Sequence, residues 1–169
     1  MPNLDLITQK IYDVIAQHGL PDCPSVYYLD PEGTEDRFKQ IPELSNAMKQ
    51  IGLYDYWTTT AAIVCYTDGL PIHDDSEPNY ALVLPIKNNK DAFTVFYDVV
   101  GDPIEKFVES KHAQLRYFMY TPEQSREIER VEITRPTIIN VRVPHNVIVY
   151  SKETPRITLA MRLHDDFKI

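Results

Sequence analysis

The side chains of this chain best suited to chemistry are two histidines, an aspartate and an arginine. His73 and Asp75 stand two positions apart, and His145 opens the apolar run Asn-Val-Ile-Val-Tyr. Two imidazoles and one carboxylate are the ligands that hold non-haem Fe(II) in a facial triad and leave coordination positions open. Arg156 follows His145 by 11 residues, and its planar guanidinium suits a carboxylate partner. The set predicts a metal site with an anion-binding residue beside it.

The spacing of His73 and Asp75 allows both side chains to reach one ion if the segment is extended. Side chains at i and i+2 share a face of an extended segment, so Asp74 would point the opposite way. The alternative is an ordinary exposed polar loop. The His-x-Asp spacing is weak evidence by itself, because His164 and Asp166 repeat it near the end of the sequence. We expect that second copy to be a solvated tail.

Arg156, Thr158 and Arg162 have the same parity in a β-rich run, so a regular strand would place all three on one face. Ile157, Leu159 and Met161 would take the other. An unpaired buried cation costs several kcal/mol, so a buried Arg156 needs an anionic partner. That partner is either a bound carboxylate or one of the 25 acidic side chains of the chain.

Size and composition predict one soluble domain spanning residues 1–169. A chain of this length can bury a hydrophobic core, and 43% hydrophobic with 25% charged residues is ordinary for a globular protein. No stretch approaches the roughly 20 apolar residues that span a bilayer. The start of the sequence has no signal-peptide pattern, and Cys23 and Cys65 suggest no disulfide framework. We therefore expect a cytoplasmic protein without a membrane partner.

Charge and glycine content exclude several function classes. The net charge of −8 argues against non-specific nucleic-acid binding, which depends on Lys and Arg that neutralise phosphates. None of the five glycines forms a GxGxxG motif, a P-loop or a GxSxG elbow. Rossmann enzymes, P-loop kinases and α/β-hydrolases are therefore poor candidates.

The order of predicted elements favours a mainly β (α+β) fold. Apolar residues at helical spacing predict a helical flank over residues 1–52, with helices at 4–18 and 43–50. Segments rich in β-branched and aromatic residues predict strands at 57–66, 80–86, 92–97, 137–141, 145–150 and 156–163. The more polar segment 99–135 predicts helices at 105–112 and 122–130. A double-stranded β-helix core over residues 57–163, the jelly-roll form of the cupins, fits this order, with 99–135 as an insert.

The order His-x-Asp, distal His and then Arg about ten residues on resembles the iron(II)- and 2-oxoglutarate-dependent oxygenase superfamily, in particular its small phage-borne or microbial members. The similarity covers residues 57–98 and 136–163. By position it implies that His73, Asp75 and His145 bind Fe(II) and that Arg156 pairs with the distal carboxylate of 2-oxoglutarate. It also implies that the hydroxyl of Thr158 supports that carboxylate and that Tyr66 donates a hydrogen bond to the co-substrate. Arg162 matches a second arginine of some branches and is either functional or structural. Val83 is a departure, because several relatives carry a polar residue at that position.

The resemblance implies a dioxygenase that couples oxidative decarboxylation of 2-oxoglutarate to hydroxylation of a second substrate. A non-catalytic jelly-roll binding or assembly module with a vestigial metal site is the alternative, and a cupin-type dioxygenase or isomerase without 2-oxoglutarate is a third reading. The substrate is not readable from the sequence, although a small molecule or a peptide side chain is favoured over nucleic acid. Aromatic residues of the insert are expected to form its core, with a pocket lining as the alternative: Phe107, Tyr117, Phe118 and Tyr120.

Overall fold

The computed structural model describes residues 3–17, 19, 25–27, 37–65, 71–75, 79–110, 113–150 and 154–169. The described helices are α1 (Leu4–Gln17) and α2 (Pro42–Gln50), which precede most of the strands. The described 3₁₀ turns are η1 (Arg37–Gln40), η2 (Tyr54–Tyr56) and η3 (Pro122–Gln124). The described strands are β1 (Ser25–Tyr27), β2 (Trp57–Cys65), β3 (His73–Asp75), β4 (Tyr80–Lys87), β5 (Ala92–Val99), β6 (Ile104–Ser110), β7 (Ala113–Met119), β8 (Ser125–Glu132), β9 (Thr137–Asn140), β10 (His145–Val149) and β11 (Arg156–Leu163).

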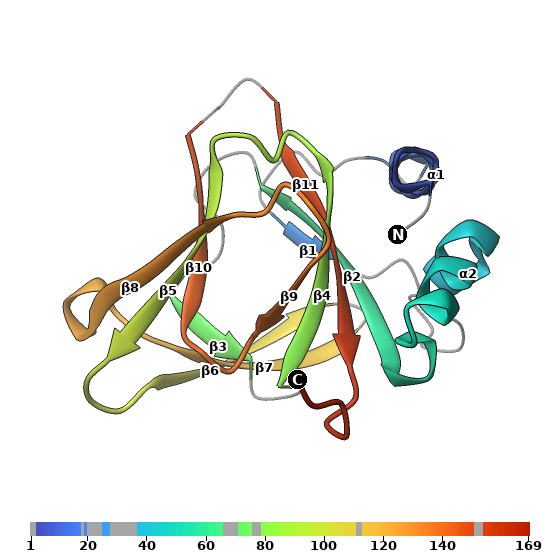
Figure 1. Cartoon of the computed structure of the whole chain (residues 1–169). Coiled ribbons are helices and arrows are strands. Elements are labelled where there is room, and N and C mark those ends of the chain that lie inside the picture. Colours follow the sequence, from blue (N-terminus) through green and yellow to red (C-terminus); the bar gives the residue numbers. More distant parts are fainter. Residues whose placement is uncertain are drawn as a thin grey trace.

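These strands form two antiparallel sheets that face each other (Figure 1). One sheet has the order β1-β2-β11-β4-β9 and the other the order β6-β7-β3-β10-β5-β8. Eight of the strands pair in a nested manner, β2 with β11, β3 with β10, β4 with β9 and β5 with β8. The nesting brings the segment around residue 73 against the segment around residue 145, although 72 positions separate them in the chain.

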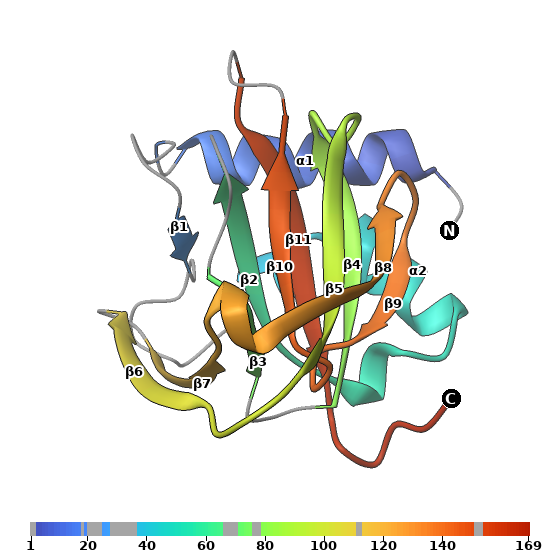
Figure 2. The same ribbon diagram turned by 90° about the vertical axis from the view of Figure 1, so that its left-hand side faces the viewer.

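The main hydrophobic core lies between the helices and the outer face of the first sheet. Ile7, Ile11 and Ile15 repeat every four residues on α1 and are buried, as expected for one face of an amphipathic helix. Figure 1 shows both helices on the same side of β2, β11 and β4, and Figure 2 shows α1 running across these strands. From β11 this core receives the side chains of Ile157, Leu159 and Met161, each with no exposed surface.

The opposite face of the first sheet looks toward the second sheet and carries several small residues. Ala160 on β11 pairs with Ala61 on β2, and Ala81 on β4 pairs with Arg162. Alternate residues of a strand point to opposite faces, so Ile157, Leu159 and Met161 face the helices while Ala61, Ala81 and Ala160 face the interior. Methyl groups in place of branched side chains leave space between the sheets, and a cavity lies there.

Two predicted helices in the segment 99–135 are wrong. Residues 104–110 form β6, which pairs with β7, and residues 125–132 form β8, which pairs with β5. The sequence Ser-Arg-Glu-Ile-Glu-Arg-Val-Glu of β8 has few apolar residues, and most of its side chains are exposed. Charged side chains are common on edge strands, where they discourage pairing with other chains, and they hide the alternating pattern of a half-buried strand.

The other predicted elements agree with the structure within a few residues, including both N-terminal helices and six strands. Pro85 lies where the β4–β11 register shifts and beyond the β4–β9 pairing, a position where its missing N–H is tolerated. His164 and Asp166 are exposed, so the predicted solvated tail is confirmed. Among the described residues, no helix combines the length and apolar character needed to cross a bilayer.

Candidate metal and anion site

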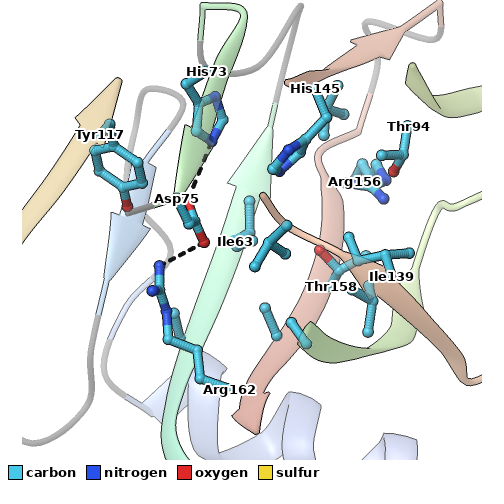
Figure 3. Close-up of a pocket in the computed structure, with 16 residues that line it drawn as sticks. Ile63, His73, Asp75, Thr94, Tyr117, Ile139, His145, Arg156, Thr158 and Arg162 are labelled. Atoms are coloured by element: carbon cyan, nitrogen blue, oxygen red, sulfur yellow. Dashed lines mark hydrogen bonds and ion pairs between the residues drawn. The ribbon is translucent and has the colours of Figure 1, made fainter. Parts of the chain in front are cut away.

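A cavity lies between the two sheets (Figure 3). Of the six residues expected to bind the metal or the co-substrate, all but Tyr66 line it: His73, Asp75, His145, Arg156 and Thr158. The space open to the centres of water molecules is about 70 Å³. About 10–15 Å³ by this measure holds one water, so the cavity has room for several waters or a small ligand. The lining residues are Ala61, Ile63, His73, Asp75, Ala81, Val83, Thr94, Tyr117, Ile139, Val141, His145, Val147, Arg156, Thr158, Ala160 and Arg162.

His73 and His145 face each other as direct cross-strand partners of β3 and β10. Their ring centroids are 4.6 Å apart. Nδ1 of His73 lies 2.7 Å from the carbonyl oxygen of Pro71, and Nδ1 of His145 lies 2.9 Å from that of Val143. A carbonyl oxygen only accepts hydrogen bonds, so each Nδ1 carries a proton, and Nε2 is the nitrogen that can donate a lone pair. Metal-binding histidines are held in this manner by a hydrogen bond from the other ring nitrogen.

Burial keeps His73 in the form that binds metals. The desolvation of the ring and, second, the neighbouring His145 lower the pKa of His73 to about 4, while Asp75 acts in the opposite direction. The ring is therefore uncharged near neutral pH, and a neutral imidazole is the form that donates a lone pair to a cation.

Asp75 points into the cavity, and its neighbour in the chain points away from it. Oδ2 of Asp75 accepts a hydrogen bond of 2.8 Å from the Arg162 guanidinium, and Oδ1 lies 3.8 Å from Nε2 of His73. Asp74 instead accepts a hydrogen bond of 2.9 Å from the hydroxyl of Tyr120. Burial raises the pKa of Asp74, while the Tyr120 hydroxyl lowers it. The prediction that Asp74 and Asp75 point to opposite faces of the extended segment is confirmed.

The triad residues have suitable donor chemistry, but their atoms do not converge on one point. Among the described residues, no three His, Cys, Asp or Glu side chains form a complete metal-binding group. Donor atoms held by one ion at 2.0–2.2 Å and at right angles are about 3 Å apart. The 3.8 Å between His73 and Asp75 would have to shorten by about 1 Å to reach that value. Two imidazoles and a carboxylate fit Fe(II) in kind. In the structure, Asp75 pairs with Arg162 at 2.8 Å.

Arg156 is the largest fully buried side chain of the described residues, with 2% of its surface exposed. Its hydrogen-bond partner is the thiol of Cys65, and its Nε has no partner within the described part of the chain. Oγ1 of Thr158, two positions further along β11, also lacks a partner there. Burial lowers the pKa of Arg156, and the Cys65 thiol opposes this effect. Arg156 and Thr158 thus have hydrogen-bonding groups in one cavity that no acidic side chain of the described residues satisfies.

The structure adds two polar residues that the sequence analysis did not place in the site. Thr94 of β5 is 3% exposed and lies beside Arg156 in Figure 3. Tyr117 of β7 lines the cavity, and its ring meets that of His73 edge to face at 5.0 Å. Of the two alternatives for the aromatic residues of the insert, pocket lining therefore holds for Tyr117, which is also buried. Val83 lines the cavity as an apolar residue, and Tyr66 lies outside the described residues.

Comparisons of the chain with protein-family models and with curated protein sequences found no match.

Proposed function

We propose that the chain is an Fe(II)- and 2-oxoglutarate-dependent dioxygenase with a double-stranded β-helix core. The nested pairing of eight strands supports the fold assignment, because a jelly roll is a long antiparallel pair folded into two facing sheets. Along the chain, the β6–β7 hairpin, Ile104–Met119, comes between β5 and β8. In the sheet it lies at the other edge, where β7 pairs with β3 and supplies Tyr117 to the cavity.

The observation that carries the proposal is a fully buried guanidinium in the same cavity as two imidazoles and a carboxylate. Arg156 has no acidic partner among the described residues, and an unpaired buried cation is costly. A bound carboxylate would satisfy both Arg156 and the neighbouring hydroxyl of Thr158. A bound ligand would therefore offset the cost of burying Arg156, whereas a purely structural role leaves that cost unexplained.

Each residue then has a definite task. His73, Asp75 and His145 would hold Fe(II), with the backbone carbonyls of Pro71 and Val143 fixing the orientation of the rings. Arg156 and Thr158 would bind the distal carboxylate of 2-oxoglutarate. When bound, iron and 2-oxoglutarate together supply the oxidising power for attack on a C–H bond.

The walls of the cavity would keep water from the reacting atoms. They consist largely of aliphatic side chains, including Ile63, Val83, Val141 and Val147. Apolar walls also strengthen the electrostatic interactions of Arg156 with an anion, because the local dielectric constant is low.

One observation favours the alternative of a non-catalytic binding module. The ion pair between Asp75 and Arg162 already neutralises the carboxylate that a metal ion would need. A domain that has lost its metal could keep this pair and still bind an anion at Arg156. The two functions differ in iron content and in turnover.

Turnover without a second substrate distinguishes them. Purified protein supplied with Fe(II), ascorbate, O₂ and 2-oxoglutarate should form succinate slowly, and Asp75→Asn should abolish this. Binding of 2-oxoglutarate without any succinate, in protein that retains no iron, would support the binding module and refute the dioxygenase.

A further inference from the structure

Arg156 and Cys65 are direct cross-strand partners of β11 and β2. The side chains of such a pair lie on the same face of the sheet, with their Cβ atoms about 5 Å apart. That face is the inner one, because Thr158 and Ile63, two positions along the same strands, both line the cavity. The Cys65 thiol is hydrogen-bonded to the guanidinium of Arg156. The contact therefore joins two neighbouring side chains on the inner face of the first sheet.

The thiol of Cys65 is itself held by the opposite sheet. Cys65 is 3% exposed and packs with Ala92 and Val149. These two residues are cross-strand partners of β5 and β10 in the second sheet. The lining of the cavity includes Arg156 but not Cys65, so the thiol contacts the guanidinium from outside the cavity. Small buried side chains of both sheets thus fix the group that orients Arg156.

A thiol in this position orients the guanidinium without neutralising it. Burial raises the pKa of Cys65, while the neighbouring Arg156 lowers it. With a raised pKa the thiol is uncharged near neutral pH. Sulfur is also a weak hydrogen-bond acceptor. The contact therefore fixes the direction of the guanidinium and leaves its positive charge available to an anion.

Hydroxyl groups complete the surroundings of the guanidinium on the cavity side. Oγ1 of Thr158 has no partner within the described part of the chain, and Thr94 lies beside Arg156 in Figure 3. A carboxylate bound there would accept hydrogen bonds from the guanidinium and from a hydroxyl. An arginine that is already held in place loses less side-chain entropy when it binds such a ligand.

We propose that Cys65 is a positioning residue for anion binding, because its thiol holds the guanidinium of Arg156 ready for a carboxylate. The proposal rests on the proposed function, in which this carboxylate is the distal one of 2-oxoglutarate. Cys65 acts through Arg156, which is the residue that contacts the ligand.

Cys65→Ser and Cys65→Ala form a matched pair of variants. Serine and alanine are nearly equal in size, and they differ by a hydroxyl that can accept the hydrogen bond from Arg156. Calorimetry on Zn(II)-loaded protein measures the Kd of 2-oxoglutarate. Cys65→Ala should bind about tenfold more weakly than Cys65→Ser, a difference of about 1.4 kcal/mol. Equal Kd values for the two variants would overturn the proposal.

Cys65→Asp tests whether the neutral charge of the thiol matters. A carboxylate at this position should pair with Arg156 and compete with the ligand, so the affinity for 2-oxoglutarate should fall as far as in Arg156→Met. Wild-type affinity in Cys65→Asp would contradict the proposed contact. Val64→Ala is the control for lost packing, because Val64 is fully buried on the helix-facing side of β2. It should lower stability and leave the Kd near that of the wild type.

The same titrations without metal separate this proposal from the proposed function. If the wild type binds 2-oxoglutarate equally well with and without Zn(II), the metal does not contact the co-substrate and the dioxygenase proposal is wrong. The comparison of Cys65→Ser with Cys65→Ala then still decides the role of Cys65. No binding of 2-oxoglutarate to the wild type under either condition would refute both proposals.

Discussion

His73 and His145 are direct cross-strand partners, and each ring donates its Nδ1 proton to the carbonyl oxygen two residues earlier in the chain. Because Nδ1 of each ring is used in this way, Nε2 is the nitrogen that can bind a further group. Backbone carbonyls thus help to fix the orientation of two neighbouring imidazoles in one cavity.

His145→Ala should strongly weaken iron binding, because it removes one of two imidazole donors from the proposed triad. Iron stoichiometry after anaerobic reconstitution measures the effect. His164→Ala is the matched control, since His164 belongs to the other His-x-Asp sequence but is exposed. Unchanged iron content in the His145 variant would exclude it as a ligand.

Asp75→Asn and Asp74→Asn should differ sharply in metal binding although the residues are adjacent. Asp75 faces the cavity, whereas Asp74 accepts a hydrogen bond from Tyr120 on the other face. We expect loss of Fe(II) binding for the first variant and near wild-type binding for the second. Equal effects would mean that β3 does not divide the two carboxylates as described.

Arg156→Met should weaken binding of 2-oxoglutarate by about 2–5 kcal/mol, as for truncation of one partner of a buried charge pair. This is roughly 30-fold to several-thousand-fold in Kd, measurable by calorimetry. Arg126→Ala is the control, because the side chain of Arg126 is 79% exposed. An unchanged Kd would make Arg156 a structural residue.

The same variant should fold at least as stably as the wild type without ligand. Replacement of buried ionic groups by apolar ones of similar volume is often neutral or stabilising by about 1–4 kcal/mol. Chemical denaturation measures the free energy of unfolding. A clear loss of stability would show that Arg156 serves the fold.

Leu159→Ala should destabilise the protein by about 2–5 kcal/mol, because Leu159 is fully buried in the core between the first sheet and the helices. Its side chain points away from the cavity, so the Kd for 2-oxoglutarate should stay near that of the wild type. Ile128→Ala on β8, which is 55% exposed, is the matched control and should change stability by about 0.5 kcal/mol or less. A large loss of affinity in Leu159→Ala would contradict the separation of the two faces of β11.

The elements that could be predicted are those whose apolar residues repeat at the regular spacing of a helix or a strand. The isoleucines of α1 and the alternation along β11 are examples, and the parity of Arg156, Thr158 and Arg162 placed them correctly on one face. β8 could not be predicted, because an edge strand exposed along most of its length has no alternation to detect.

The site was predictable in its residue types but less so in its contacts. Asp75 and Arg162 are 87 positions apart, and no local pattern reveals that they form an ion pair. Tyr117 reaches the cavity because β7 pairs with β3, a non-local contact that strand propensity does not specify. The lack of an acidic partner for Arg156 among the described residues also depends on tertiary structure.

An anaerobic titration with Fe(II) and then 2-oxoglutarate tests the central claim most directly. Chelation of the co-substrate to iron should produce a visible metal-to-ligand charge-transfer band in the wild type. The band should be absent in His145→Ala and in Arg156→Met at the same concentrations. No band in wild-type protein whose circular dichroism shows an intact β fold would contradict the metal and co-substrate site.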